Sequence, residues 1–134
     1  MTCSKQDCAS LLLRLSFGSI LLAHGLIKIF VFTVAGTVGF FESLGFPAIV
    51  AYLTIFGEVA GGLAIILGVY TRLAALLTLP ILLGATYVHL GSGFLFSNPN
   101  GGWEFPALLV ILAIVITMQG AGKYSICNKD ICNK

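Results

Sequence analysis

The sequence predicts an all-α integral membrane protein, a bundle of four transmembrane helices formed by a single domain over residues 1–134. Only 9% of the residues are charged, against about 25% in an average soluble domain. The hydrophobic fraction is 58%, which is more apolar surface than a compact soluble fold of this length can bury. The bilayer must therefore be the solvent for much of the chain.

The net charge is only +2, and the basic residues form no cluster. A nucleic-acid-binding protein needs a concentrated basic surface, and a disordered chain needs low hydrophobicity with high net charge. Both classes are excluded, and we expect no nucleic-acid partner.

The first helix is expected over about residues 10–33, because about 20 mostly apolar residues are needed to cross the hydrocarbon core. This segment is longer than the apolar core of a signal peptide and is interrupted by Arg14, His24 and Lys28, so we expect it to be retained. The connection that follows contains Gly36, Gly39, Gly45 and Pro47, which disfavour a helix there.

The other helices are expected over about residues 48–70, 73–90 and 105–120. The second and third are separated only by the neighbourhood of Thr71 and Arg72, so we expect them to be antiparallel neighbours. A loop rich in glycine and asparagine over residues 91–102 separates the third from the fourth.

The basic residues predict the orientation. Lys28 lies toward one side of the bundle, and six others lie toward the opposite side: Lys5, Arg14, Arg72, Lys123, Lys129 and Lys134. Since cytoplasmic loops carry an excess of Lys and Arg, we expect both termini to be cytoplasmic, in the inner membrane of a bacterium.

Ionisable residues inside a membrane are costly, so each is a candidate functional residue. Counted at about 1.5 Å per residue from the cytoplasmic end, His24, Glu58 and His89 all lie at a depth of about 18–24 Å on three different helices. Lys28 is one turn beyond His24. We predict that these four residues form a polar, catalytic pocket, in which His24 and Glu58 handle protons while Lys28 and His89 hydrogen-bond substrate oxygens.

Three further charged residues are predicted to contact a cofactor: Arg14 and Arg72 near the cytoplasmic end, and Glu104 farther out. A purely structural explanation stays open for each polar residue, because Glu58 could simply neutralise a neighbouring cation. The groups would also suit a metal or haem, but the sequence contains no recognisable haem, flavin or dinucleotide motif.

Four cysteines lie in the two short tails, at about residues 1–9 and 123–134. They are Cys3, Cys8, Cys127 and Cys132. With both tails on one face, all four thiols could meet. Three interpretations stay open: a zinc or other metal site, a redox-active dithiol, and cysteines without a specific role. A reducing cytoplasm disfavours stable disulfides, whereas the reverse orientation would favour them.

Several motifs follow one another along the chain: LRL at 13–15, HGLIK at 24–28, FESLGFP at 41–47, EVAGG at 58–62, LGVYTR at 67–72 and GAGKYSI at 120–126. This order resembles that of the DoxX family of small bacterial membrane proteins with four helices. The resemblance covers about residues 11–126. The paired cysteines are not part of the family pattern, and Cys127 stands where relatives often have an acidic residue.

The resemblance implies a four-helix bundle in the inner membrane, with Arg14, His24, Lys28, Glu58 and Arg72 at motif positions. Related DoxD-type proteins are membrane subunits of thiosulfate:quinone oxidoreductases, and other relatives take part in redox homeostasis within complexes. We therefore expect a membrane oxidoreductase, or a subunit of one, that binds a quinone or quinol and is linked to sulfur or thiol redox chemistry.

The alternative is a non-catalytic membrane anchor or assembly subunit whose cysteine tails bind a metal or a partner protein. A small-solute transporter is a third possibility, although four short helices leave little room for a pathway. We expect membrane lipids as partners, together with other subunits or further copies of the chain.

Overall fold

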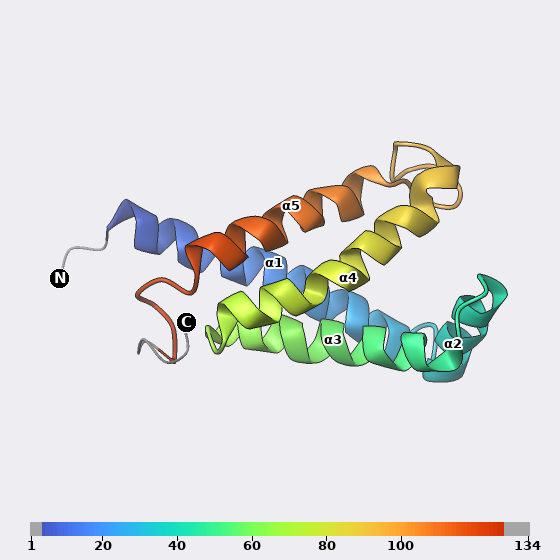
Figure 1. Ribbon diagram of the computed structural model, residues 1–134, viewed down its shortest axis with the longest axis horizontal. Helices are drawn as coiled ribbons and strands as arrows, with labels where there is room; N and C mark the ends of the chain where they lie inside the picture. Colours follow the sequence, from blue (N-terminus) through green and yellow to red (C-terminus); the bar gives the residue numbers. More distant parts are fainter. Residues whose placement is uncertain (1–3, 128–134) are drawn as a thin grey trace.

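The computed structural model describes residues 4–127, which form helices, turns and loops without a strand (Figure 1). The elements are α1 (Lys5–Phe30), α2 (Val34–Ser43), α3 (Ala48–Leu67), α4 (Thr71–His89), the short 3-10 helix η1 (Leu90–Ser92) and α5 (Glu104–Gln119). Lys5–Phe30, Ala48–Leu67 and Thr71–Ser92 are long and apolar enough to cross a membrane, and α5 is a shorter apolar helix. The all-helical membrane class is therefore confirmed, while the count of four crossings stays a prediction.

Helices α3 and α4 are antiparallel neighbours, as the sequence predicts. Gly68 ends α3 in the left-handed conformation, with φ of 77°, which glycine adopts without steric cost. Its neighbour Val69 donates a backbone hydrogen bond of 2.9 Å to the Ala64 carbonyl, and α4 begins at Thr71. The turn is therefore so short that the two helices can only be antiparallel neighbours.

Close packing joins α1 to α3. A Cβ atom added at Gly62 would lie 2.8 Å from the carbonyl oxygen of Gly18, and one added at Gly18 would lie 2.9 Å from the carbonyl oxygen of Gly62. Small residues at such a contact let two helix backbones approach within a membrane. The α1–α3 contact is therefore one of backbone against backbone at these two glycines.

Packing continues around the bundle from α3 to α4, from α4 to α5, and from α5 back to α1. The buried core takes side chains from these four helices: Phe17, Leu21, Ile65, Ala75, Leu82, Leu109, Ala113 and Ile116. Large apolar side chains also cover the outside, and Phe56, Tyr87 and Met118 are at least 70% exposed. Such a surface fits a protein whose outer face contacts lipid.

The prediction that the first connection lacks a helix is wrong, because residues 34–43 form α2 in spite of Gly36 and Gly39. Thr33 caps this helix, since its Oγ1 accepts a hydrogen bond of 3.1 Å from the Gly36 backbone N–H. Thr37 is buried, and α2 packs against both α1 and α3. Tertiary packing therefore offsets the low helix propensity of the two glycines.

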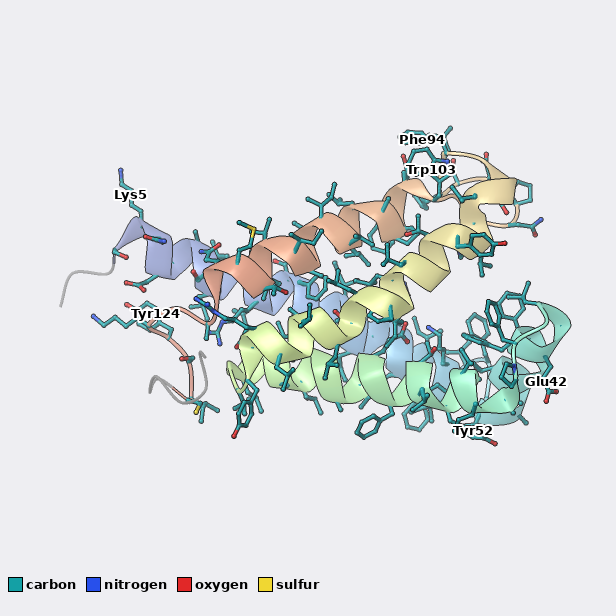
Figure 2. The ribbon with its side chains drawn as sticks, in the orientation of Figure 1. Lys5, Glu42, Tyr52, Phe94, Trp103 and Tyr124 are labelled. Carbon is teal, nitrogen blue, oxygen red and sulfur yellow. The ribbon has the colours of Figure 1, made fainter. Side chains whose placement is uncertain are left out.

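The two ends of the bundle differ. The start of α1, the α3–α4 turn and the end of α5 lie at one end, and α2, η1 and the loop before α5 lie at the other (Figure 1). Lys5 and Tyr124 mark the first end, whereas Glu42 and Trp103 mark the second (Figure 2). We call these the terminal end and the α2 end. Helices α4 and α5 diverge from α1 and α3 toward the α2 end (Figure 1).

Candidate functional site

One ion pair is present among residues 4–127, and it joins α1 to α3. Lys28 Nζ lies 2.7 Å from Glu58 Oε2 and 3.0 Å from Oε1, so the ammonium donates to both carboxylate oxygens. The Lys28 side chain is 19% exposed and that of Glu58 is 8% exposed. Because an ammonium has three N–H donors and Glu58 accepts two, one donor of Lys28 remains for a ligand.

His24 lies one turn before Lys28 on α1 and within electrostatic range of Glu58. Its Nδ1 is 2.8 Å from the carbonyl oxygen of Ile20, and because a carbonyl only accepts, Nδ1 carries the proton of the neutral ring. Nε2 is then a hydrogen-bond acceptor. The exposed imidazole stacks on Phe105 of α5, with ring centroids 5.9 Å apart.

The helix packing holds this group of residues in place. A Cβ added at Gly25 would lie 3.1 Å from the Cβ of Glu58 and 2.7 Å from Cγ2 of Val59, so α1 and α3 are in direct contact beside the ion pair. At the end of α1, the Thr37 hydroxyl of α2 lies 3.0 Å from the Lys28 carbonyl oxygen. Three helices therefore determine the position of Lys28.

His89 lies elsewhere, in a pocket of about 400 Å³ between α2 and the end of α4. The pocket is lined by Phe40, Leu44, Val88, His89, Ser92 and Asn100. The expected group of residues is thus divided: the structure brings His24, Lys28 and Glu58 together and places His89 in a second site. Helical rise predicts depth but not direction, and α4 diverges from α1 and α3 at this end.

Arg14 is buried at the terminal end, with 1% of its surface exposed. Its Nη2 donates to the carbonyl oxygen of Tyr124, while Nε and Nη1 have no partner among the described residues. The guanidinium lies against Gly68 and Ser125. Arg14 therefore holds the segment after α5 against the bundle, at the end opposite to α2.

Arg72 and Glu104, the other predicted cofactor contacts, are also apart from the ion pair. Arg72 is exposed at the start of α4, where a Cβ at Gly120 would lie 2.8 Å from its Nε. Glu104 Oε1 accepts a hydrogen bond of 3.1 Å from the Phe96 backbone N–H, and so it stabilises the loop before α5. The structure does not bring these two residues to Lys28 and Glu58.

The described cysteines, Cys8 and Cys127, are both disulfide-bonded. In this form neither sulfur is a thiolate, which is the species that binds zinc or attacks a disulfide. Cys3 and Cys132 lie outside the described residues, so the hypothesis of a site with four cysteines stays a prediction. Within residues 4–127, no three His, Cys, Asp or Glu side chains are grouped as a metal site would require.

The sequence reasoning missed Phe105, which provides the stacking surface for His24, and three of the residues that line the His89 pocket: Phe40, Ser92 and Asn100. Phe105 follows Glu104 at the start of the fourth predicted segment, and its aromatic character was the available signal. The pocket residues come from a helix and a loop whose contacts no local pattern indicates.

Two comparisons with known proteins give a match. The DoxX family profile matches residues 9–91. The chain is 34% identical over 116 residues to "Putative oxidoreductase CatD" of Bacillus subtilis (strain 168), which covers 86% of this chain and 81% of that protein. No solved structure matches the chain. The profile match includes both the ion pair and His89, whereas Glu104 and Cys127 lie beyond it.

Proposed function

Since the chain belongs to the DoxX family, we propose that it is a membrane oxidoreductase, or the membrane subunit of a redox complex, that binds a quinone or quinol among its helices. The observation that carries the proposal is the Lys28–Glu58 ion pair between α1 and α3, with the His24 imidazole beside it. The family and the oxidoreductase name of the relative support the redox class.

The donor set fits an oxygen-bearing ring. Lys28 offers an N–H donor to a carbonyl or phenolate oxygen, and its positive charge favours an oxygen that gains electron density. Glu58 accepts or relays a proton, and the free Nε2 of His24 accepts one from a hydroxyl. A bound quinone would accept two electrons and two protons when it is reduced to the quinol. These residues would hold or pass the protons at its ring oxygens.

The surroundings also fit a lipid-soluble carrier. An apolar pocket of about 310 Å³ lies between α1, α2 and α3, lined by Ile29, Val34, Tyr52, Ile55, Phe56 and Val59. Ile29 and Val59 directly follow Lys28 and Glu58 in sequence, so the pocket has nearly the same depth as the ion pair. It is suited to the hydrocarbon part of the carrier.

The electron donor is proposed to be a partner subunit, with thiol chemistry at the tails as one source of reducing equivalents. Cys8 precedes Arg14 by less than two turns of α1, far from Lys28 along the same helix. Direct transfer from the tails to the ion pair would therefore need a further carrier. We place the protein in the bacterial inner membrane, with its termini on the cytoplasmic side and lipid around it.

Glu58→Gln tests the proposal while keeping the size of the side chain. We expect extraction and mass spectrometry of the gently solubilised wild-type protein to recover quinone near one molecule per chain. In Glu58→Gln membranes, quinone-dependent turnover should fall at least about a hundredfold, in the range found for lost proton-transfer groups. Membrane insertion, measured by fractionation, should not change.

Glu42→Gln is the matched control, because Glu42 is exposed on α2. It should keep full turnover. Full turnover in Glu58→Gln would refute the proton role. If no quinone is recovered, and tail cysteine substitutions break a complex while Glu58→Gln impairs folding alone, the non-catalytic anchor is the better explanation.

A further inference from the structure

The pocket that contains His89 is a second polar site, separate from the ion pair. Its volume of about 400 Å³ falls within the range of small-molecule sites. Its lining comes from α2, the end of α4, η1 and the loop that follows, and neither Lys28 nor Glu58 is part of it. A ligand here would bind at the α2 end of the bundle.

The chemistry of His89 in this pocket follows from its partner. Nδ1 lies 2.7 Å from the carbonyl oxygen of Ala85, four residues earlier on α4. Because the carbonyl can only accept, the neutral imidazole carries its proton on Nδ1, and Nε2 is left with a lone pair. His89 is therefore ready to accept a hydrogen bond from a ligand O–H.

Gly101 packs closely against the Nε2 edge of the His89 ring. A Cβ atom added at Gly101 would lie 3.2 Å from Nε2 and 2.9 Å from Cδ2 of His89. Apart from the adjacent residues of the chain, no other atom lies within 4 Å of that position. Glycine therefore fits against this edge of the imidazole, where a Cβ would lie too close to Cδ2.

The rest of the lining selects the kind of molecule. Phe40, Leu44 and Val88 form an apolar wall, while Ser92 and Asn100 add neutral polar groups. The lining includes neither Lys nor Arg, so an anionic head group would lack a partner for its charge. The pocket is suited to a neutral ring that carries hydroxyl groups.

We propose that this pocket binds the ring of a quinol, with one ring hydroxyl donating a hydrogen bond to His89 Nε2. The inference rests on the proposed function, because it names the reduced, hydroxyl-bearing form of the same carrier as the ligand of a second site. A quinone presents carbonyl oxygens, which cannot donate to a neutral imidazole. His89 therefore favours the hydroxyl-bearing form of the carrier.

Nitrogen NMR of the two histidines tests this inference directly. The chain has two histidines, so protein labelled with ¹⁵N-histidine in lipid nanodiscs reports each imidazole, and His24→Gln assigns the signals. At pH 8 and without oxygen, we expect a short-chain quinol to shift the Nε2 resonance of His89 in a saturable way. The matching quinone and the dimethyl ether of the quinol should bind at least about tenfold more weakly, because neither has an O–H donor.

Leu44→Trp fills the pocket from α2 and should weaken the quinol response of His89 about tenfold. Leu83→Trp is the control, since Leu83 is 55% exposed on α4 and does not line the pocket. An unmoved His89 signal, an equal response to the dimethyl ether, or a response to anionic lipid alone would overturn the inference. If the quinol shifts the signal of His24 alone, the second site is refuted and the proposed function is supported. If Glu58→Gln keeps full turnover and the His89 titration is normal, only the proton role of Glu58 is refuted.

Discussion

Replacing Gly62 with alanine tests whether direct backbone contact between α1 and α3 holds the ion pair in position. The new Cβ would lie 2.8 Å from the Gly18 carbonyl oxygen and 2.8 Å from the Leu22 nitrogen. Both are backbone atoms, so no side-chain rotation relieves the contact. The helices must separate by about 0.6 Å to restore an ordinary contact of 3.4 Å.

Overpacking of this kind costs about 1–3 kcal/mol, while alanine regains about 0.5–1 kcal/mol over glycine within a helix. We expect a net loss of about 1–2 kcal/mol in the free energy of unfolding. The assay is unfolding of the purified protein in mixed micelles with increasing dodecyl sulfate, followed by circular dichroism. Because Glu58 is one turn from Gly62, quinone-dependent turnover should also fall several-fold.

Gly84→Ala is the matched control, because Gly84 is on α4 and, apart from its chain neighbours and the adjacent backbone of its own helix, no atom lies within 4 Å of its added Cβ. It should leave turnover unchanged and raise the free energy of unfolding by about 0.5–1 kcal/mol. If both alanine variants shift the unfolding midpoint in the same direction by a similar amount, the close α1–α3 contact is refuted.

Three further predictions concern the ends of the bundle. Thr33→Ala removes the N-cap of α2 and should cost about 1 kcal/mol in the same unfolding assay, whereas Thr33→Asn keeps a side-chain acceptor and should be more stable than Thr33→Ala. Equal stability of the two variants would contradict the cap. Arg14→Met releases the Tyr124 carbonyl, so trypsin should cleave after Lys123 about fivefold faster, and an unchanged rate would show that Arg14 does not hold this segment. Iodoacetamide should modify Cys8 and Cys127 only after reduction, as read by peptide mass spectrometry, and labelling before reduction would contradict the disulfide-bonded state.

The disulfide-bonded state of Cys8 and Cys127 bears on the predicted orientation. A cytoplasmic location keeps most thiols reduced, so stable disulfides there are uncommon. Labelling of intact cells with a membrane-impermeant thiol reagent, after treatment with a membrane-impermeant reductant, would show on which side the tails lie. The charge distribution predicts protection of the tails in that experiment.

The long apolar helices could be predicted because their signal is local. Length and hydropathy define a membrane helix, and glycine at the end of α3 marks the turn into α4. The same local reasoning failed at α2, where Gly36 and Gly39 indicate a loop. The contacts of α2 with the two neighbouring helices α1 and α3 depend on how the chain turns between them, and no pattern within residues 34–43 contains them.

For the candidate site, too, one part could be predicted from the sequence and another part could not. Ionisable residues in apolar segments identified His24, Lys28, Glu58 and His89 from sequence, because a charge in a membrane is costly wherever its helix packs. The pairing of Lys28 with Glu58, by contrast, depends on the contact between α1 and α3, and the separation of His89 depends on the divergence of α4. Composition and periodicity are therefore sufficient for the class and the long apolar helices, since each residue contributes to them independently. The partners of each polar side chain follow from how the helices turn and pack against one another, which is a property of the assembled bundle.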